Sequence, residues 1–464
     1  MTDANSLLLP NTQAVSSDCL YNLKASSVRA RSYRASIPPS NSQTFTGAQT
    51  AIFYIPCGRK NSFIDPTQTY LKFTVKNNDG TNAFFVDNIA SSFINRLDIF
   101  HGSNMIDTIQ QYNVLASYIK DFTLNSSESY GLSSMYGTSV DATTASKCRQ
   151  GLSLPSSSSA TFCIPLLSSI FANCDKMLPI GQLYDDIRIE LTWEANTQAI
   201  CAAGGTPTWT VTDAQLMCQI IELSDEGMQQ VESATPFNNP VYIHSTSYRH
   251  YVSTLPAGTG GTFSTLVPSR FASTKTLIML PRRAPEIAAA TTHSISTRFN
   301  PAINSYWWRI GGAMIPQKPV TLYNPNAGAG YAEGFAEIMK SWHSLSSPDM
   351  CGGLNLTTFN ATDILDANVD ASVPTGIPSS ATTSKGSAGY TAGFAIAQEL
   401  ESFANRSDLL LSGMNTLSSQ VFFECNLGLK SDFSCLPLTA TTLDFYAQYD
   451  QILVIENGIM SCRF

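Results

Sequence analysis

The five histidines are the residues best suited to metal or acid–base chemistry, and they are dispersed along the chain: His101, His244, His250, His293 and His343. His244 and His250 stand at even spacing in a strand-like segment, so their side chains share one face. No HExxH motif or comparable ligand cluster accompanies them. A metal centre in a cupin-type barrel needs converging histidines. We therefore expect surface or interface histidines, with no metal or cofactor site.

Other signatures of catalysis are missing from the sequence. It contains no GxSxG elbow, no Walker A motif and no CxxC pair, and its 11 cysteines fit no nucleophile pattern. Gly328, Gly330 and Gly334 superficially resemble a dinucleotide-binding turn, but their GxGxxxG spacing and the lack of a βαβ pattern favour a turn and a helix start. The sequence therefore predicts a protein that is not an enzyme and has no small-molecule substrate.

A cluster of aromatic residues, Tyr306, Trp307 and Trp308, is suited to stacking on sugars or bases. Such side chains are more often anchors of a core or an interface. The cluster nevertheless keeps open an alternative function, that of a carbohydrate-binding or adhesive β-sandwich protein.

The elements that position these residues are mostly strands. In 185–194, four apolar residues alternate with polar ones, which places the apolar set on one face of a strand. Such one-sided alternation favours antiparallel sheets. We predict strands at 51–56, 70–76, 93–100, 103–109, 160–167, 185–194, 213–223, 241–252, 262–267, 273–281, 305–311, 319–323, 390–397, 419–427 and 441–456.

Two segments have helical periodicity instead. Apolar residues recur every three or four positions in 112–122 and in 335–345. A long stretch rich in Ser, Thr and Gly follows each helix, at 123–159 and at 346–389. Loops of this length in a compact protein are usually functional or mobile.

The order of predicted elements occurs twice along the chain. At an offset of 232 residues, segment 161–181 aligns without gaps with segment 393–413. Seven residues match: Phe162, Ile164, Phe171, Ala172, Asn173, Leu178 and Gly181 correspond to Phe394, Ile396, Phe403, Ala404, Asn405, Leu410 and Gly413. The shared element order gives these matches their weight and indicates two similar β-domains joined near residues 224–240.

This duplication predicts the fold class and the domains. We expect an all-β fold with short inserted helices, made of two tandem eight-stranded antiparallel jelly rolls; a Greek-key sandwich of another topology remains an alternative. The first jelly roll is expected at 46–232 and the second at 233–464. Residues 1–45, rich in Ser, Asn and Pro, are expected to form an N-terminal arm.

Composition and charge limit the classes of function. Charged residues make up 13% of the chain, against about 25% in typical soluble proteins. An uncharged polar surface tolerates close packing against copies of itself. The net charge of −8 disfavours a dedicated nucleic-acid binder. The N-terminus does not resemble a secretory signal, and no stretch approaches 18 apolar residues, so we expect neither secretion nor a membrane span.

The arm reverses this overall charge. Between Asp18 and Asp65 there is no acidic residue. The candidate site residues in this stretch are Lys24, Arg29, Arg31 and Arg34. They indicate either a solvated tail or an arm that faces something anionic.

Three segments resemble parts of the double jelly-roll major capsid proteins, most closely those of polinton-like viruses, adintoviruses and virophages: FINRLDIFHGSNMIDTIQQYNVLASYIKDF (93–122), ATFCIPLLSSIFANCDKMLPIG (160–181) and YDQILVIENGIMSCRF (449–464). The resemblance implies homotrimers with a pseudo-hexameric outline that tile an icosahedral shell around a DNA genome. It also implies location in the virion after assembly inside the host cell, contacts with penton and minor capsid proteins, and an arm on the inner face near DNA or an internal membrane.

Overall fold

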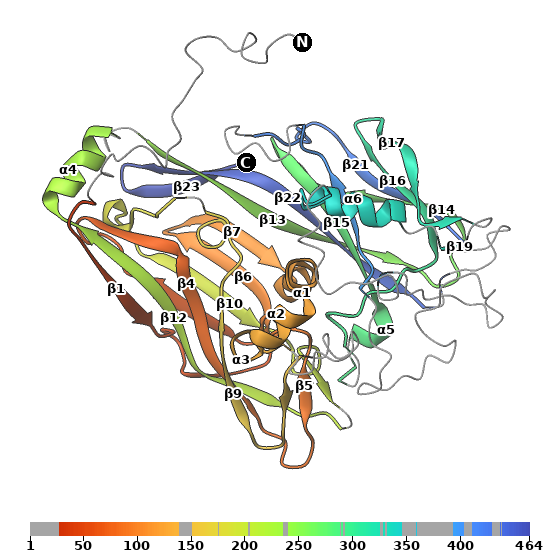
Figure 1. Ribbon diagram of the computed structural model, residues 1–464, viewed down its shortest axis with the longest axis horizontal. Helices are drawn as coiled ribbons and strands as arrows, with labels where there is room; N and C mark the ends of the chain where they lie inside the picture. Colours follow the sequence, from red (N-terminus) through yellow and green to blue (C-terminus); the bar gives the residue numbers. More distant parts are fainter. Residues whose placement is uncertain are drawn as a thin grey trace, which may run out of the picture.

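Two β-sandwiches stand side by side in the computed structural model of the chain (Figure 1). The structure describes residues 27–138, 151–174, 176–202, 205–234, 240–287, 289–290, 293–324, 328–329, 332–345, 359, 393–402, 411–428, 437 and 439–464.

The first sandwich consists of two four-stranded antiparallel sheets that pack face to face. The strand orders are β1-β12-β4-β9 and β3-β10-β6-β7. In β10, alternate side chains from Ile187 to Trp193 are buried against the opposite sheet, as the sequence pattern predicts. The bounds are β1 (Ala30–Ile37), β3 (Thr50–Ile55), β4 (Ser62–Asn77), β6 (Ile94–His101), β7 (Asn104–Gln110), β9 (Ser159–Ile164), β10 (Ile187–Trp193) and β12 (Trp209–Leu223).

The second sandwich repeats this plan. Its sheets have the orders β13-β22-β15-β20 and β14-β21-β16-β17. The bounds are β13 (Val241–Leu255), β14 (Gly261–Val267), β15 (Thr274–Arg283), β16 (Ile303–Ile310), β17 (Ala313–Thr321), β20 (Ile396–Glu399), β21 (Val421–Leu427) and β22 (Thr441–Glu456). Each sandwich therefore has the two four-stranded sheets of a jelly roll, and the predicted fold class is confirmed.

Shorter strands extend these sheets or form small ones. β2 (Thr44–Thr46) pairs with β12, and β23 (Ile459–Arg463) pairs with β22. Two small sheets are formed by β11 (Ile200–Ala202), β5 (Phe84–Val86) and β8 (Ser153–Leu154), and by β18 (Tyr323–Asn324) with β19 (Gly328–Ala329).

Three of the seven pairs matched at the 232-residue offset lie wholly within the described residues and occupy equivalent places: Phe162 and Phe394, Ile164 and Ile396, and Gly181 and Gly413; the partners at 403–405 and 410 lie outside the described residues. Phe162 beside β4 and Phe394 beside β15 are both fully buried. A Cβ on Gly181 would lie 2.6 Å from the Arg59 carbonyl oxygen, and one on Gly413 would lie 2.5 Å from the Thr274 carbonyl oxygen. Glycine is thus needed at the same point of each sandwich because a backbone passes too close for a side chain.

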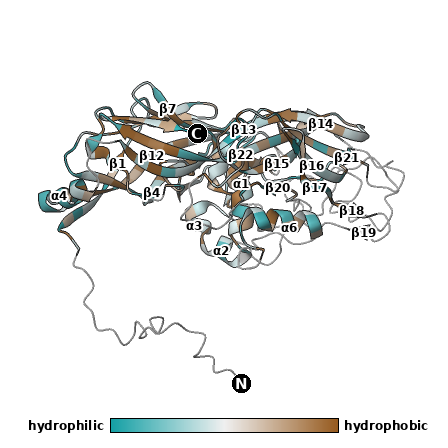
Figure 2. Cartoon of the chain, turned by 90° about the horizontal axis from the view of Figure 1, so that it is seen from above, coloured by the Kyte–Doolittle hydropathy of each residue, from teal (hydrophilic) through white to brown (hydrophobic). Residues whose placement is uncertain are grey.

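Helices connect and flank the sandwiches. Both predicted helices are present, as α1 (Tyr112–Thr123) and α6 (Ala332–Ser341), the second beginning three residues earlier than expected. α1 lies between the two sandwiches (Figure 1), and α2, α3 and α6 lie on one side of the molecule (Figure 2). The remaining bounds are α2 (Ser126–Gly131), α3 (Ser133–Tyr136), α4 (Asp225–Ala234), α5 (Ala284–Ile287) and two 3₁₀ helices, Ala90–Phe93 and Ile180–Gln182.

The expectation of an arm over residues 1–45 is wrong in its last third. Ala30–Ile37 form β1, which pairs along its whole length with Ile37 opposite Leu216 and Ala30 opposite Leu223. The reason is a weak alternation in which the half-buried Tyr33, Ala35 and Ile37 face the body of the protein. Residues 1–26 lie outside the described part of the chain.

The long segments after the helices differ from the expected plain loops. Within 123–159 the chain forms α2, α3, β8 and the first residue of β9, while 139–150 lie outside the described residues. Of 346–389, the structure describes Phe359, which is 2% exposed. The expected domain boundary at 232/233 falls within α4, between the last strand of the first sandwich and the first strand of the second. We propose this connection as the division between the two folding units.

Candidate functional site: the junction of the jelly rolls and a basic edge strand

Two helices, α1 and α6, form one part of the junction between the jelly rolls. They come after β7 and β17, which occupy equivalent places in the two sandwiches. Phe122 of α1 stacks on Trp342, with ring centroids 6.3 Å apart, and contacts Phe335 of α6 at 6.5 Å. The Trp342 indole nitrogen donates a hydrogen bond of 3.2 Å to the Tyr118 hydroxyl. Phe122, Phe335 and Trp342 are among the apolar residues that recur at helical spacing in the sequence.

A buried ion pair crosses the junction beside these rings. Asp121 on α1 accepts a hydrogen bond from the Arg298 guanidinium, and their side chains are 3% and 0% exposed. The guanidinium carbon also lies 5.9 Å from the centre of the Tyr118 ring. Arg298 Nε donates a hydrogen bond of 3.3 Å to the carbonyl oxygen of Phe394, two residues before β20. The Arg298 side chain therefore contacts both the first jelly roll, at Asp121, and the residues just before β20.

A second buried charge pair lies near the short strand β5. Asp87 contacts His293 Nδ1 at 3.1 Å and accepts hydrogen bonds from the Ser296 hydroxyl at 2.5 Å and the Ile295 amide at 2.9 Å. Burial alone would raise the pKa of Asp87, but these partners hold it below its usual value. Burial disfavours the charged form of His293, yet contacts with Cys201 and Asp87 outweigh it and raise the pKa of His293 to about 9.

The strand edges complete the junction. Ser247 of β13 donates a 2.5 Å hydrogen bond to Asp107 of β7, and Gln451 of β22 donates one of 2.6 Å to the Ile106 carbonyl oxygen. The Met460 amide of β23 donates to Nδ1 of His101 at 3.0 Å. Burial raises the pKa of Asp107.

This junction gives the two jelly rolls one relative orientation. Its buried polar groups must find partners, because an unpaired one costs about 1–3 kcal/mol and an unpaired charge more. A sideways slip of one jelly roll would break the pairs at Asp87, Asp107 and Asp121 together. The molecule is thus a body with two similar halves in a fixed arrangement.

The candidate basic residues do not form one free arm. Lys24 lies outside the described residues. Arg31 and Arg34 project from β1, the edge strand of its sheet, and Arg29 precedes it; all three are exposed. The neighbouring cations are already neutralised, since Arg59 pairs with Glu222 at 2.9 Å.

Among the residues that the structure describes, Arg29, Arg31 and Arg34 form no ion pair within 4 Å. Arg34 donates a hydrogen bond of 3.1 Å to the Tyr70 hydroxyl, and Arg31 lies 5.5 Å from the ring centre of Tyr33. Two purposes suit such residues: protection of an edge strand from wrong pairing, and contact with an anionic partner.

The structure separates the two histidines that share a strand. His244 contacts Asp450 at 3.1 Å and His250 contacts Asp444 at 2.8 Å, each aspartate lying on β22. Both pairs lie within one sheet of the chain, and the expectation of surface or interface histidines stays a prediction. The expectation of no metal-ligand cluster missed His343, which the fold brings beside Glu399 and Glu401.

The aromatic cluster of the alternative function belongs mainly to the core. Tyr306 and Trp308 are both fully buried, because β16 turns alternate side chains inward. Trp307 faces outward and donates its indole hydrogen to Glu424 at 2.7 Å. Buried rings are unable to stack on a sugar, so the feature that suggested carbohydrate binding has a structural explanation.

Sequence reasoning did not find the junction pairs. Asp121 and Arg298 are 177 positions apart, and Asp87 and His293 are 206 apart. The helical pattern did not indicate Asp121 either, because it falls on the side of the predicted helix away from Ala116 and Ile119, yet the structure buries it.

No helix in the described part of the chain is both long and apolar enough to cross a membrane. No protein-family model matches the sequence, and no curated protein matches it.

Solved viral structures match it in fold over almost its full length. A structure of the PBCV-1 virus capsid aligns with a TM-score of 0.60 at 12% identity, covering 96% of this chain and 98% of that one. The Sputnik virophage structure aligns with a TM-score of 0.55 at 11% identity, covering 98% and 93%. The mavirus major capsid protein aligns with a TM-score of 0.51 at 10% identity, covering 99% and 95%.

These matches extend through both sandwiches and their junction, so the chain has the double jelly-roll fold found in those capsid structures. At such low identity the likeness concerns the arrangement of elements and not individual side chains.

Proposed function

We propose that this chain is a viral major capsid protein that acts by assembly and not by catalysis. Three chains would form a trimer with six similar corners, because each contributes two similar jelly rolls. Such trimers would tile an icosahedral shell around a DNA genome, with penton and minor capsid proteins as further partners.

The observation that carries this proposal is the fixed pair of equivalent sandwiches. The strand orders of the two are identical element for element, and buried contacts at Asp87, Asp107 and Asp121 lock their orientation. A pseudo-sixfold capsomer needs that geometry, since three copies produce six near-equivalent units only if both halves are alike and rigidly joined. The fold match to capsid structures over more than nine-tenths of both chains supports the same function.

Electron microscopy of the purified full-length protein tests shell formation. We expect trimeric capsomers with a hexagonal outline that pack into closed shells or flat hexagonal sheets under assembly conditions. The control is Arg298→Met, which removes one side of the ion pair between the jelly rolls and should reduce the yield of ordered arrays. A wild-type protein that forms no particle or array under any condition that preserves its fold would contradict the proposal.

We further propose that Arg29, Arg31 and Arg34 line the inner face of the shell and contact DNA. Their support is the lack of ion-pair partners among the described residues, which leaves three cations available in a chain of net charge −8. Each phosphate contact releases counterions, so the logarithm of the affinity should fall with the logarithm of salt concentration, by about 0.9 per contact.

The test is salt-dependent DNA binding by assembled or trimeric protein. Replacing the three arginines by glutamine should lower the salt slope by up to about 3 while leaving β1 intact. The matched control is Arg59→Gln, because that arginine is already paired with Glu222. DNA affinity and salt slope equal to those of wild type in the triple variant would exclude this role. A second variant lacks residues 1–26 and preserves every residue of β1. It separates the contribution of those residues to DNA binding from that of the three arginines.

A further inference from the structure

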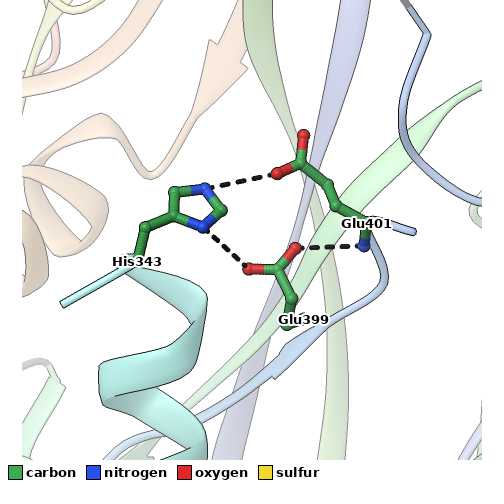
Figure 3. Close-up of side chains that lie close together, drawn as sticks. All are labelled: His343, Glu399 and Glu401. Carbon is green, nitrogen blue, oxygen red and sulfur yellow. Dashed lines mark hydrogen bonds and ion pairs between the residues drawn. The ribbon is translucent and has the colours of Figure 1, made fainter. Parts of the chain in front are cut away.

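His343, Glu399 and Glu401 form a cluster of metal-binding side chains outside the junction contacts described above (Figure 3). His343 follows the end of α6, while Glu399 ends β20 and Glu401 comes two residues later. One ligand atom from each residue lies within 4.8 Å of those of the other two. The fold thus joins residues 56 positions apart, on either side of the long segment that begins at residue 346.

The separations in the cluster suit a small cation. His343 Nε2 lies 3.2 Å from Glu401 Oε2, and His343 Nδ1 lies 3.8 Å from Glu399 Oε2. Metal–ligand bonds of 2.0–2.1 Å in a tetrahedron place neighbouring ligand atoms about 3.3 Å apart. The two contacts of His343 use different ring nitrogens, so a single ion would take one nitrogen of His343 together with one oxygen of each glutamate, and the side chains would rotate to bring these atoms, which lie within 4.8 Å of one another, onto the ion.

One oxygen of the cluster lacks a hydrogen bond. The Glu399 side chain is 10% exposed, and its Oε2 atom is buried without a hydrogen-bond donor. Its other oxygen accepts from the Glu401 amide at 3.0 Å, which holds the carboxylate in place. A buried carboxylate oxygen without a donor is costly, and a cation would satisfy it.

The remaining neighbours orient the ligands. Lys275 Nζ lies 2.8 Å from Glu401 Oε1, and the Ser412 hydroxyl donates to the same oxygen at 2.7 Å. These contacts leave Glu401 Oε2 turned toward His343. Asp450 lies 3.7 Å from Lys275 and 3.1 Å from His244, so it is paired outside the cluster.

Two of the three side chains, His343 and Glu401, reach a cavity. This cavity has a volume of about 120 Å³ and is lined by side chains from both jelly rolls, including Tyr118, Lys275, Trp342, His343 and Glu401. The cavity provides a path for an ion and room for a water molecule as a further ligand. An imidazole with two carboxylates suits zinc better than calcium or magnesium, which prefer oxygen ligands alone.

We propose that His343, Glu399 and Glu401 bind one divalent transition-metal ion, of which zinc fits the ligand set best. The ion fastens the end of α6 to the end of β20. This inference goes beyond the proposed capsid function, and its three ligands all belong to the second jelly roll.

Calorimetric titration of chelator-treated, full-length protein with zinc chloride tests the site. The variants are Glu399→Gln, which keeps the shape of the side chain, and His343→Ala. Wild type should bind one zinc ion per chain at this site, and each variant should weaken that binding by about tenfold or more. The matched control, Glu424→Gln, removes a carboxylate of the same jelly roll that faces Arg309 and Trp307, and should bind zinc as wild type does.

Thermal unfolding distinguishes a cluster that binds metal from one that only stabilises the fold. Without zinc, Glu399→Gln should melt at or above the wild-type temperature, because it removes a buried carboxylate. With zinc, the melting temperature of wild type should rise and that of Glu399→Gln should not. The 11 cysteines of the chain are also able to bind zinc. The site is therefore defined by the difference in zinc-induced stabilisation between wild type and Glu399→Gln. Equal zinc binding by wild type and both variants, or no saturable binding by wild type, would overturn the proposal.

Discussion

Replacing Arg298 by methionine removes one side of the buried ion pair that crosses between the jelly rolls. Methionine approximates the length of the arginine side chain but carries no charge, so the space remains filled. The variant leaves the Asp121 carboxylate, whose side chain is 3% exposed, without its guanidinium partner. The hydrogen bond from Asn88 to that carboxylate, at 3.3 Å, is kept.

The expected cost follows from this burial. Removing one partner of a buried ion pair costs about 3–5 kcal/mol, because the remaining charge is held away from water. The double variant Asp121→Asn/Arg298→Met leaves no charge at these two positions, and the asparagine oxygen still accepts from Asn88. It should recover most of the loss. As a matched control, Arg309→Met breaks a pair in which the arginine is 42% exposed, for which about 0–1 kcal/mol is expected.

Urea denaturation followed by tryptophan fluorescence measures these differences. Wild type, Arg298→Met, the single variant Asp121→Asn and the double variant together form a double-mutant cycle. A loss below about 1 kcal/mol in Arg298→Met, equal to that of the exposed control, would refute the reasoning that this pair is buried and holds the jelly rolls together.

Two further predictions concern the junction and the repeated backbone contact. The pKa of His293 is raised from 6.5 to about 9 in the folded protein, so its contribution to stability is complete below pH 6.5 and is lost as the pH rises through about 9. Unfolding measured across this range should show a decline of up to about 3 kcal/mol that His293→Gln lacks; the same pH dependence in both proteins would contradict this. Gly413→Ala should cost about 1–3 kcal/mol, because the new Cβ would lie 2.5 Å from the Thr274 carbonyl oxygen. Gly80→Ala, with no atom within 4 Å of its Cβ, should leave the melting temperature nearly unchanged, and equal effects of the two substitutions would argue against the close backbone approach.

The regular elements of this fold were predictable because their periods are local. Ile187 to Trp193 alternate without interruption, and the strand and its buried face follow directly. The duplication was visible for a related reason: Gly181 and Gly413 meet a passing backbone at equivalent points, so both halves of the sequence keep a glycine there.

β1 was mistaken for part of an arm because its alternation is weak. Tyr33, Ala35 and Ile37 are only half-buried on an edge strand, while arginine and serine occupy the exposed positions between them. Polar residues on an edge strand resemble a solvated tail in sequence, and only pairing with β12 distinguishes the two.

The candidate sites were harder to predict because their partners are remote in sequence. Asp121 and Arg298 meet only after two separate sandwiches have formed and docked. His343 and Glu399 meet because α6 packs beside β20, whatever lies between them in the chain. No fixed spacing in the sequence connects such residues. The position of His343 in the sequence therefore did not predict that Glu399 and Glu401 lie beside it.

The mass of the native particle in solution tests most directly whether this chain assembles with its own copies in threes. Native mass spectrometry or light scattering of the purified 50.2 kDa chain should give a species of about 150 kDa that persists on dilution, as expected for an obligate interface. A stable, well-folded species of about 50 kDa at every concentration would contradict the account.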